Sequence, residues 1–312
     1  MNEKKNVKKR FDEALETFVD FIKEDKNIIT AVLFGSLIEG NVWEKSDVDI
    51  FLISNDEKVP YRFYWLDQDD LNFQVSVYSR NNFKRQFERS LTGSWFQHMI
   101  NTSKILFSKD ETISEYIQQA QSPGKRDVEL QILTIVAMVI GDLEKAEKFL
   151  IMKNDVAQSY LFIVRLLDRL AQIEVLLNGE VPKREVLEQA MKYKSELFDT
   201  IFTSVILETT NKVKMEDIIR LIRTYLEERT ESIFSIIIDY FREEQEVRSI
   251  TDITTHLNKM MQSSWWEVAT LAYCQWLHQY GYLERFAQPA RLTSKSFIQV
   301  NEIAYTYTGG DE

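Results

Sequence analysis

The sequence predicts an α+β protein in which helix predominates. Short apolar runs typical of strands are confined to the first third of the chain, and a long stretch of helical periodicity follows them. Only 9 glycines and 4 prolines occur in 312 residues, and their scarcity favours helices over loops. The length favours several domains, and we expect a mixed sheet with helices over residues 1–110, a helical bundle over 111–245 and a winged-helix-like domain over 246–312.

The first region begins with a helix and continues into a sheet. Apolar residues recur at helical spacing over residues 11–22. Strands are predicted at the apolar or alternating runs 28–34, 48–53, 71–78 and 105–107. Helices at 81–89 and 94–100 are expected to cover this sheet.

The central region is expected to be entirely helical. Its helices are predicted at residues 111–121, 127–150, 155–178, 183–192, 195–208 and 215–242. Asn154, Asn178-Gly179 and Lys212 fall between these segments, where they act as turns or caps rather than as flexible linkers. The pattern therefore predicts a single bundle.

The C-terminal region combines helices with a β-hairpin. Two helices and two strands are predicted, at residues 250–261, 264–280, 281–283 and 297–307. A turn is expected near Gln288-Pro289, and helices that end in a hairpin are typical of a winged helix. Residues 248–308 carry five Lys or Arg against four Asp or Glu, so contact with protein is favoured over DNA, although nucleic acid stays an open alternative for this region.

The composition predicts a cytoplasmic protein that does not contact membranes. Residues 1–10 are polar and basic, unlike a signal peptide, and the longest apolar stretch, 130–141, is too short to span a bilayer. The single cysteine, Cys274, cannot form an internal disulfide and is expected to be buried. A formal charge of −11 opposes nonspecific attraction to nucleic acid, so nucleic acid is not a favoured partner.

Residues suited to phosphate chemistry gather where the first two strands meet. The sequence reads Gly35-Ser36, then ten residues, then Asp47-Val48-Asp49 at the head of an apolar strand. Residues two apart on a strand share a face, so Asp47 and Asp49 can hold a divalent metal together as oxygen ligands. At Gly35 and Ser36, backbone N–H groups and a hydroxyl can approach a triphosphate without a bulky side chain between them.

This segment resembles the signature of the polymerase-β-like nucleotidyltransferase superfamily, which is Gly-Ser followed by Asp-x-Asp. Gly40 in the intervening loop and Ser46 before Asp47 fit the signature, and the resemblance covers roughly residues 28–80. It implies that Asp47 and Asp49 bind Mg²⁺, and that Ser46 joins Gly35 and Ser36 in binding ATP or another nucleoside triphosphate.

The sequence departs from the superfamily pattern at the third carboxylate, which usually follows on a later strand as a metal ligand or base. The residue at that position is Gln74, whose neutral amide cannot accept a proton. Asp69 or Asp70 would replace it only if the strand register were different. We therefore assign Gln74 to the catalytic position.

Another source of a base is a polar stripe on the helix predicted at 155–178. Arg165, Asp168, Arg169 and Gln172 have the spacing 0, 3, 4 and 7, which places them on one face. In the first interpretation this is a solvated face with a salt bridge. In the second, Arg165 and Arg169 contact phosphate or acceptor and Asp168 is the missing base.

The central region also resembles, more loosely, the middle domain of bacterial nucleotidyltransferase-like proteins of the YgxA type. The residues that carry this resemblance are Leu176-Leu177-Asn178-Gly179-Glu180, Pro182, Arg184-Glu185, Gln189-Ala190 and Leu197-Phe198. It implies a nucleotidyltransferase domain followed by a helical substrate-binding domain and a C-terminal helix-turn-helix.

Two functions are consistent with these features. The first is a Mg²⁺-dependent nucleotidyltransferase that moves a nucleoside monophosphate, with AMP from ATP as the expected case, to a hydroxyl of an unidentified small molecule or protein. The second is a nucleotide-binding regulator or pseudoenzyme that has lost turnover through Gln74 and acts through an interaction or DNA-binding tail.

Overall fold

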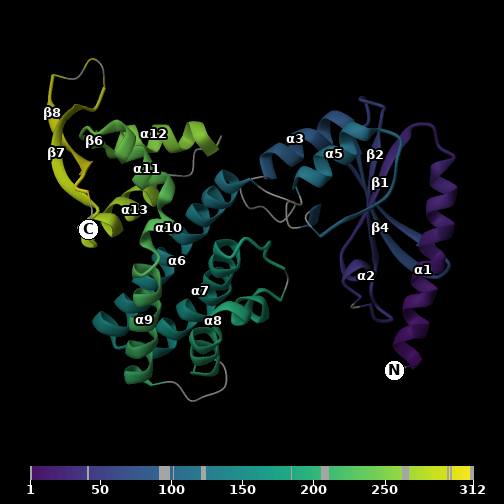
Figure 1. Ribbon diagram of the computed structural model, residues 1–312, viewed down its shortest axis with the longest axis horizontal. Helices are drawn as coiled ribbons and strands as arrows, with labels where there is room; N and C mark the ends of the chain where they lie inside the picture. Colours follow the sequence, from purple (N-terminus) through teal and green to yellow (C-terminus); the bar gives the residue numbers. More distant parts are fainter. Residues whose placement is uncertain are drawn as a thin grey trace. The chain divides into compact units, whose positions relative to one another are not determined.

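The chain folds into two units, Met1–Gly124 and Lys125–Glu312, which are drawn in Figure 1. The computed structural model describes residues 2–40, 42–90, 99–100, 102–120, 124–183, 185–204, 211–261, 267–293, 295 and 297–309. The first unit extends past the boundary expected at residue 110, because the following helix packs into its core. The division of the second unit at residue 245 stays a prediction.

The first unit is built on a five-stranded mixed sheet of order β3-β4-β2-β1-β5. Its strands are β1 Ile28–Phe34, β2 Val48–Ser54, β3 Arg62–Gln68, β4 Leu71–Ser79 and β5 Lys104–Ser108. The pair β2–β4 is parallel and the other pairs are antiparallel. Four strands were predicted, but β3 was not, because its residues are largely exposed on both faces and lack an apolar alternation.

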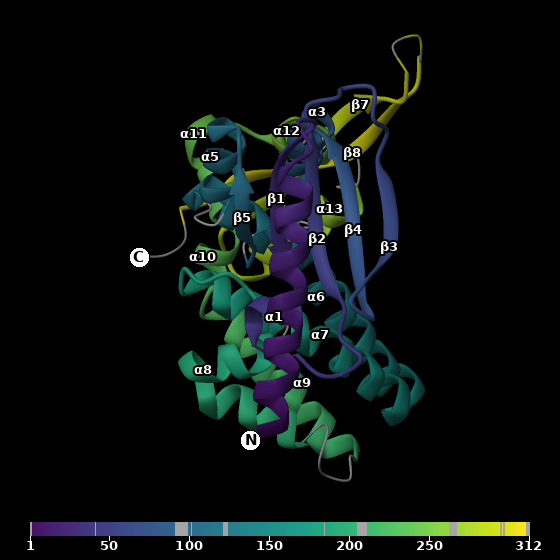
Figure 2. The ribbon, with the colours of Figure 1, turned by 90° about the vertical axis from the view of Figure 1, so that its right-hand side faces the viewer.

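Helices cover both faces of this sheet. Figure 2 shows α1 (Asn2–Lys23) lying over one face of the sheet, where Phe18 packs against Phe73 of β4 with ring centroids 5.0 Å apart. On the other face, α3 (Arg80–Ser90) and α5 (Glu111–Ala120) supply Phe83, Ile113 and Ile117 to a second apolar cluster. The mixed sheet with helices is confirmed, and the part of the helix predicted at 94–98 lies outside the described residues.

The second unit begins with a bundle of antiparallel and crossing helices. They are α6 Lys125–Lys153, α7 Val156–Leu177, α8 Val186–Phe202, α9 Lys212–Glu227, α10 Thr230–Ile233 and α11 Ser235–Glu244. The prediction of one helix over 215–242 was wrong, because the chain breaks around Arg229 and Phe234, where the Thr230 hydroxyl bonds back to Leu226. The two helices predicted at 183–192 and 195–208 correspond to the two halves of α8, which are separated by non-helical backbone at Lys194, and residues 205–208 lie outside the described part.

The C-terminal part of this unit shares its core with the bundle. It consists of β6 Arg248–Ser249, α12 Ile250–Met261, α13 Glu267–Gln279, β7 Leu283–Arg291 and β8 Gln299–Tyr307, with sheet order β6-β8-β7. The turn expected at Gln288-Pro289 was wrong. Pro289 lies inside β7 opposite Asn301, and an edge strand tolerates its missing N–H.

Apolar side chains from α6 through β8 form one continuous cluster, which includes Leu133, Tyr273 and Tyr305. Cys274 is buried in it, as predicted, and burial raises the pKa of its thiol. No helix in the described ranges is long and apolar enough to cross a membrane.

Candidate functional site

The candidate site lies on the α3/α5 face of the first sheet, where four residues form a row across neighbouring strands. Phe34 of β1 is paired with Asp49 of β2, Asp49 with Gln74 of β4, and Gln74 with Trp65 of β3. Paired residues in a sheet point to the same face, so these four side chains lie side by side. The predicted Asp-x-Asp strand therefore holds Asp49 between a buried phenylalanine and an amide.

Gly35 ends β1 directly beside Asp49. Its φ of 81° and ψ of −159° fall in a region that is essentially restricted to glycine. A Cβ at this position would overlap Oδ2 of Asp49. The glycine of the Gly-Ser pair thus lets the backbone come close to the Asp49 carboxylate, whereas the approach of this backbone to a triphosphate stays a prediction.

Asp47 and Asp49 are half-buried carboxylates that repel each other. Burial, and then the charge of Asp47, raise the pKa of Asp49 from 3.8 to about 6. Within the described part of the chain neither residue forms a salt bridge with Lys, Arg or His. The pair is therefore destabilised when both carboxylates are charged, and a bound cation would relieve that cost.

The donors present fit a divalent cation. Two adjacent carboxylates are hard oxygen ligands of the kind that Mg²⁺ binds through one or two carboxylates together with substrate phosphates and water. No group of three or more His, Cys, Asp or Glu side chains forms among the described residues. Asp47 and Asp49 would hold the ion, and the remaining ligands would come from outside the chain.

The loop around this pair contains the two predicted serines. Ser36 begins α2 (Ser36–Glu39), a single turn that ends at Gly40 with φ 75°. So short a helix has little dipole, and a phosphate would contact individual N–H and hydroxyl groups there. The Ser46 hydroxyl accepts a hydrogen bond of 3.1 Å from the Trp43 amide and closes the turn before Asp47. The role of Ser46 in binding a nucleotide stays a prediction.

The strand register places Gln74, and neither Asp69 nor Asp70, beside Asp49. Asp69 and Asp70 form the tight turn between β3 and β4, with φ of 55° and 58°. Their carbonyl groups accept hydrogen bonds from Arg10 at 3.1 and 3.3 Å. A neutral amide therefore occupies the position next to the carboxylate pair.

The polar stripe on α7 lies in the second unit and is bound to α6. Asp142, which is 3% exposed, contacts Arg169 at 2.7 Å and Arg165 at 3.5 Å. The exposed Asp168 accepts a hydrogen bond of 2.7 Å from Gln172. These contacts favour the interpretation of the stripe as a salt-bridged surface, and they do not connect it with Asp47 and Asp49.

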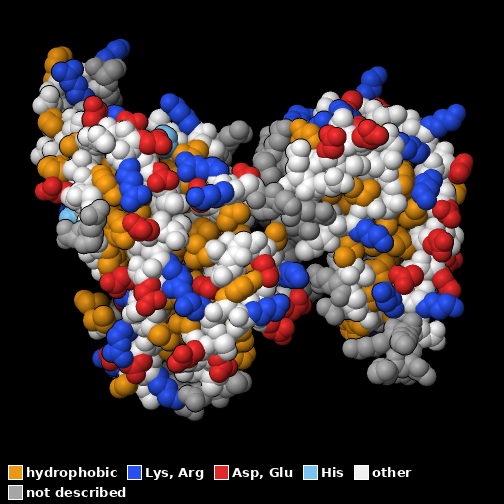
Figure 3. Space-filling model, viewed as in Figure 1, with side chains coloured by type: hydrophobic (Ala, Val, Ile, Leu, Met, Phe, Trp, Pro, Cys, Tyr) orange, Lys and Arg blue, Asp and Glu red, His pale blue; other side chains and the backbone are white. Residues whose placement is uncertain are grey.

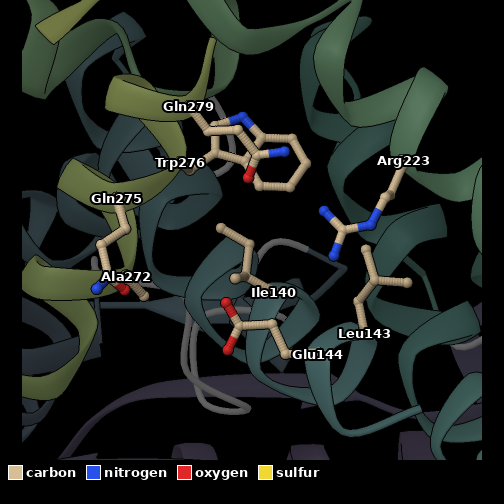
Figure 4. Close-up of a pocket in the computed structure, with 8 residues that line it drawn as sticks. All are labelled: Ile140, Leu143, Glu144, Arg223, Ala272, Gln275, Trp276 and Gln279. Atoms are coloured by element: carbon tan, nitrogen blue, oxygen red, sulfur yellow. The ribbon is translucent and has the colours of Figure 1, made fainter. Parts of the chain in front are cut away.

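A small pocket in the second unit lies between α6, α9 and α13 (Figure 4). Arg223 points into it but also pairs with Glu147 and lies over the Trp276 ring at 5.9 Å. Its lining consists of Ile140, Leu143, Glu144, Arg223, Ala272, Gln275, Trp276 and Gln279. Because the Arg223 guanidinium is already paired with Glu147, it is not free to bind an anionic ligand in this pocket.

Sequence reasoning missed the aromatic residues of β3 that share the face of Asp49. Trp65 is 58% exposed and Phe63 is 43% exposed, with ring centroids 5.7 Å apart at 81°. Tyr61 packs against Tyr78 of β4 at 5.0 Å. The sequence did show aromatic residues at the alternate positions 61, 63 and 65. Their proximity to Asp49, however, depends on the pairing of β3 with β4 and of β4 with β2.

Comparison with known proteins supports the assignment of this unit. Residues 16–112 match the family model described as polymerase beta, nucleotidyltransferase. The fold resembles that of a nucleotidyltransferase-like protein from Exiguobacterium sibiricum 255-15, with a TM-score of 0.66, 13% sequence identity, and coverage of 96% of this chain and 99% of that chain. No curated protein matches the sequence. The N-terminal unit of this chain is a nucleotidyltransferase domain of the polymerase-β-like superfamily.

Proposed function

We propose that the protein is a Mg²⁺-dependent nucleotidyltransferase that moves a nucleoside monophosphate from a triphosphate, with ATP as the expected donor, to a hydroxyl group. The observation that carries this proposal is that Gly35 packs directly against Asp49, next to Asp47, and that neither carboxylate forms a salt bridge with a described residue. Such an arrangement keeps side-chain bulk out of the space next to two carboxylates. It suits a ligand that carries several phosphates and a cation.

In this proposal each group has a separate task. Asp47 and Asp49 hold the cation, and the Gly35 backbone and Ser36 hydroxyl contact the triphosphate. Bound Mg²⁺ supplies neutralisation of the phosphate charge and orientation for in-line attack at the α-phosphorus. The Gln74 amide can donate a hydrogen bond to the acceptor or to a phosphate oxygen, but it does not remove a proton.

The acceptor is proposed to be a small molecule or a protein rather than a nucleic acid. The net charge of −11 disfavours attraction to phosphate backbones. Acidic and basic side chains are interspersed over the faces of both units seen in Figure 3, without an extended basic patch in the parts that are coloured. It stays a prediction that the helical bundle binds the acceptor. A role of the winged-helix-like part in contacting a partner is likewise a prediction.

A thermal-unfolding titration with each of the four nucleoside triphosphates, with and without Mg²⁺, tests the proposal. A ligand that binds only the native state raises stability with the logarithm of its concentration. We expect Mg²⁺-dependent stabilisation by at least one triphosphate in the wild type and its loss in Asp47→Ala/Asp49→Ala. Equal stabilisation of the double variant would refute the assigned site.

A regulator that binds nucleotide without turnover is the second candidate, and the pairing of Gln74 with Asp49 favours it. Gln74→Glu separates the two functions, with Gln118→Glu on exposed α5 as a matched change. A gain of nucleotide transfer in Gln74→Glu alone would indicate a decayed enzyme. A loss of existing transfer would indicate that the amide suits the native reaction.

A further inference from the structure

The edge strand β3 provides an exposed aromatic surface next to the candidate site. Trp65 pairs directly with Gln74, which pairs with Asp49, so two strand spacings of about 4.8 Å separate Trp65 from Asp49. Phe63 lies two residues from Trp65 on the same face, and the two rings form an edge contact of 5.7 Å. We call Phe63 and Trp65 the aromatic platform.

The platform and the Gly-Ser pair lie on opposite sides of Asp49. Gly35 follows β1, which pairs with one edge of β2, whereas Gln74 and Trp65 lie beyond its other edge. In-line displacement at phosphorus requires the acceptor to enter opposite the departing pyrophosphate. If the triphosphate binds at Gly35 and Ser36, as the proposed function holds, the acceptor enters across Gln74 and the platform.

The neutral amide at position 74 restricts which acceptors can react. An aliphatic hydroxyl is about as weak an acid as water and needs a base to remove its proton. A phenol has a pKa of about 10 and reaches its reactive ionised form with far less assistance. The platform adds an apolar surface that favours edge or offset packing of an aromatic ring.

We infer that the acceptor is a phenolic hydroxyl, carried by a small phenol or by a tyrosine side chain, whose ring packs on Phe63 and Trp65 while its oxygen lies near Gln74. This inference rests on the proposed function. The phenolic oxygen forms a bond to the α-phosphorus, and the bond from that phosphorus to the bridging oxygen of the β-phosphate breaks. Pyrophosphate leaves with the electron pair, and the phenolic proton passes to water.

Three matched acceptors test the inference with the full-length protein, Mg²⁺ and each nucleoside triphosphate. N-acetyl-tyrosinamide has a ring and a hydroxyl, N-acetyl-serinamide only the hydroxyl, and N-acetyl-phenylalaninamide only the ring. We expect mass spectrometry to find a nucleotidyl adduct on the tyrosinamide alone. Tyramine and a tyrosine-containing tripeptide then distinguish a small phenol from a polypeptide by their relative kcat/KM.

Variants of β3 test whether the aromatic ring of the acceptor packs on Trp65. Trp65→Ala should raise the KM for the tyrosinamide about tenfold, while triphosphate stabilisation is unchanged and Trp65→Phe restores most of the affinity. Tyr64→Ala is the matched control, because Tyr64 pairs with Val75 on the opposite face and is 38% exposed. Equal effects of Trp65→Ala and Tyr64→Ala on this KM would overturn the proposed role of the aromatic platform in binding the acceptor.

The outcomes separate the inference from the function on which it rests. Absence of Mg²⁺-dependent triphosphate binding would overturn both. Triphosphate binding with transfer to serinamide as efficient as to tyrosinamide would overturn the phenolic acceptor and leave the nucleotidyltransferase proposal in place. Binding without transfer to any of the phenols would likewise overturn the inference alone.

Discussion

Asp49 in the first unit and Asp142 in the second are carboxylates removed from water, yet their surroundings differ. Asp142 is paired with Arg165 and Arg169, which neutralise it within the fold. Asp49 instead adjoins a second carboxylate, and its pKa rises to about 6. A buried charge with built-in partners is thus compensated within the fold, whereas one left without them is suited to an added cation.

The largest effect is expected from Gly35→Ala. The backbone conformation of Gly35 is strained for any other residue, and the added methyl group overlaps Asp49. We expect a loss of about 3 kcal/mol in the free energy of unfolding and a drop in triphosphate affinity of about a hundredfold, measured by urea unfolding and calorimetric titration. Gly40→Ala is the matched control, because Gly40 also has positive φ but nothing lies within 4 Å of its Cβ position.

Gly40→Ala should cost only about 1 kcal/mol and leave triphosphate affinity unchanged. Equal losses of affinity in the two variants would show that the close approach of Gly35 to Asp49 does not matter for binding.

Asp142→Asn should produce the next largest effect, and on stability alone. Removing the buried carboxylate leaves Arg165 and Arg169 without their partner, at a cost of about 2 kcal/mol in urea unfolding because both arginines keep some contact with water. Asp168→Asn, at an exposed site on the same stripe, should change stability by less than about 0.5 kcal/mol. If Asp168→Asn abolished nucleotide transfer, the stripe would have to be part of the active site after all.

A smaller effect is expected in the pH dependence of the metal-free protein. The native pKa of Asp49 is raised from 3.8 to about 6, so between these values the native state binds more protons than the unfolded state. Asp49 therefore lowers stability as pH rises through this window, by roughly 1 kcal/mol once partial exposure is allowed for. Denaturation of the wild type and Asp49→Asn between pH 4 and 7 measures the difference.

The wild type should lose stability relative to Asp49→Asn as pH rises, and its affinity for Mg²⁺ should fall below about pH 6, since the ligand must be deprotonated. Parallel stability curves for the two proteins would contradict the raised pKa.

The smallest effect is expected from Ser46→Ala. Loss of the hydrogen bond from the Trp43 amide should cost about 0.5 to 1 kcal/mol in thermal unfolding. If Ser46 only closes the turn, triphosphate affinity changes less than threefold. A tenfold or greater loss would assign Ser46 to the nucleotide instead.

The sequence was sufficient for features that depend on local spacing. Strands β1, β2 and β4 have apolar faces that are visible as periodicity. The two-residue spacing of Asp47 and Asp49 predicts that they share a side at the head of β2, and the structure places Asp49 on the α3/α5 face of the sheet. The departure at Gln74 was also predictable, because alternation along β4 fixes which residues face Asp49.

Features that depend on packing between distant segments were not predictable. Trp65 lies next to the site because the register of β3 on β4 pairs it with Gln74. The exposed strand β3 has no apolar pattern from which this register could be predicted. Asp142 lies where the apolar run of α6 gives way to a charged segment, and its pairing with Arg169 requires α6 and α7 to pack together. Neither contact leaves a local signal in the sequence.

In the proposed function, Asp47, Asp49 and Gly35 form one site for a cation and a triphosphate. Crystals grown with Mn²⁺ and a nonhydrolysable triphosphate test it most directly, because manganese gives an anomalous signal. We expect an anomalous peak about 2.1 Å from carboxylate oxygens of Asp47 and Asp49, with phosphates against Gly35 and Ser36. Manganese and triphosphate bound elsewhere, with no metal at Asp47 and Asp49, would contradict the assigned site.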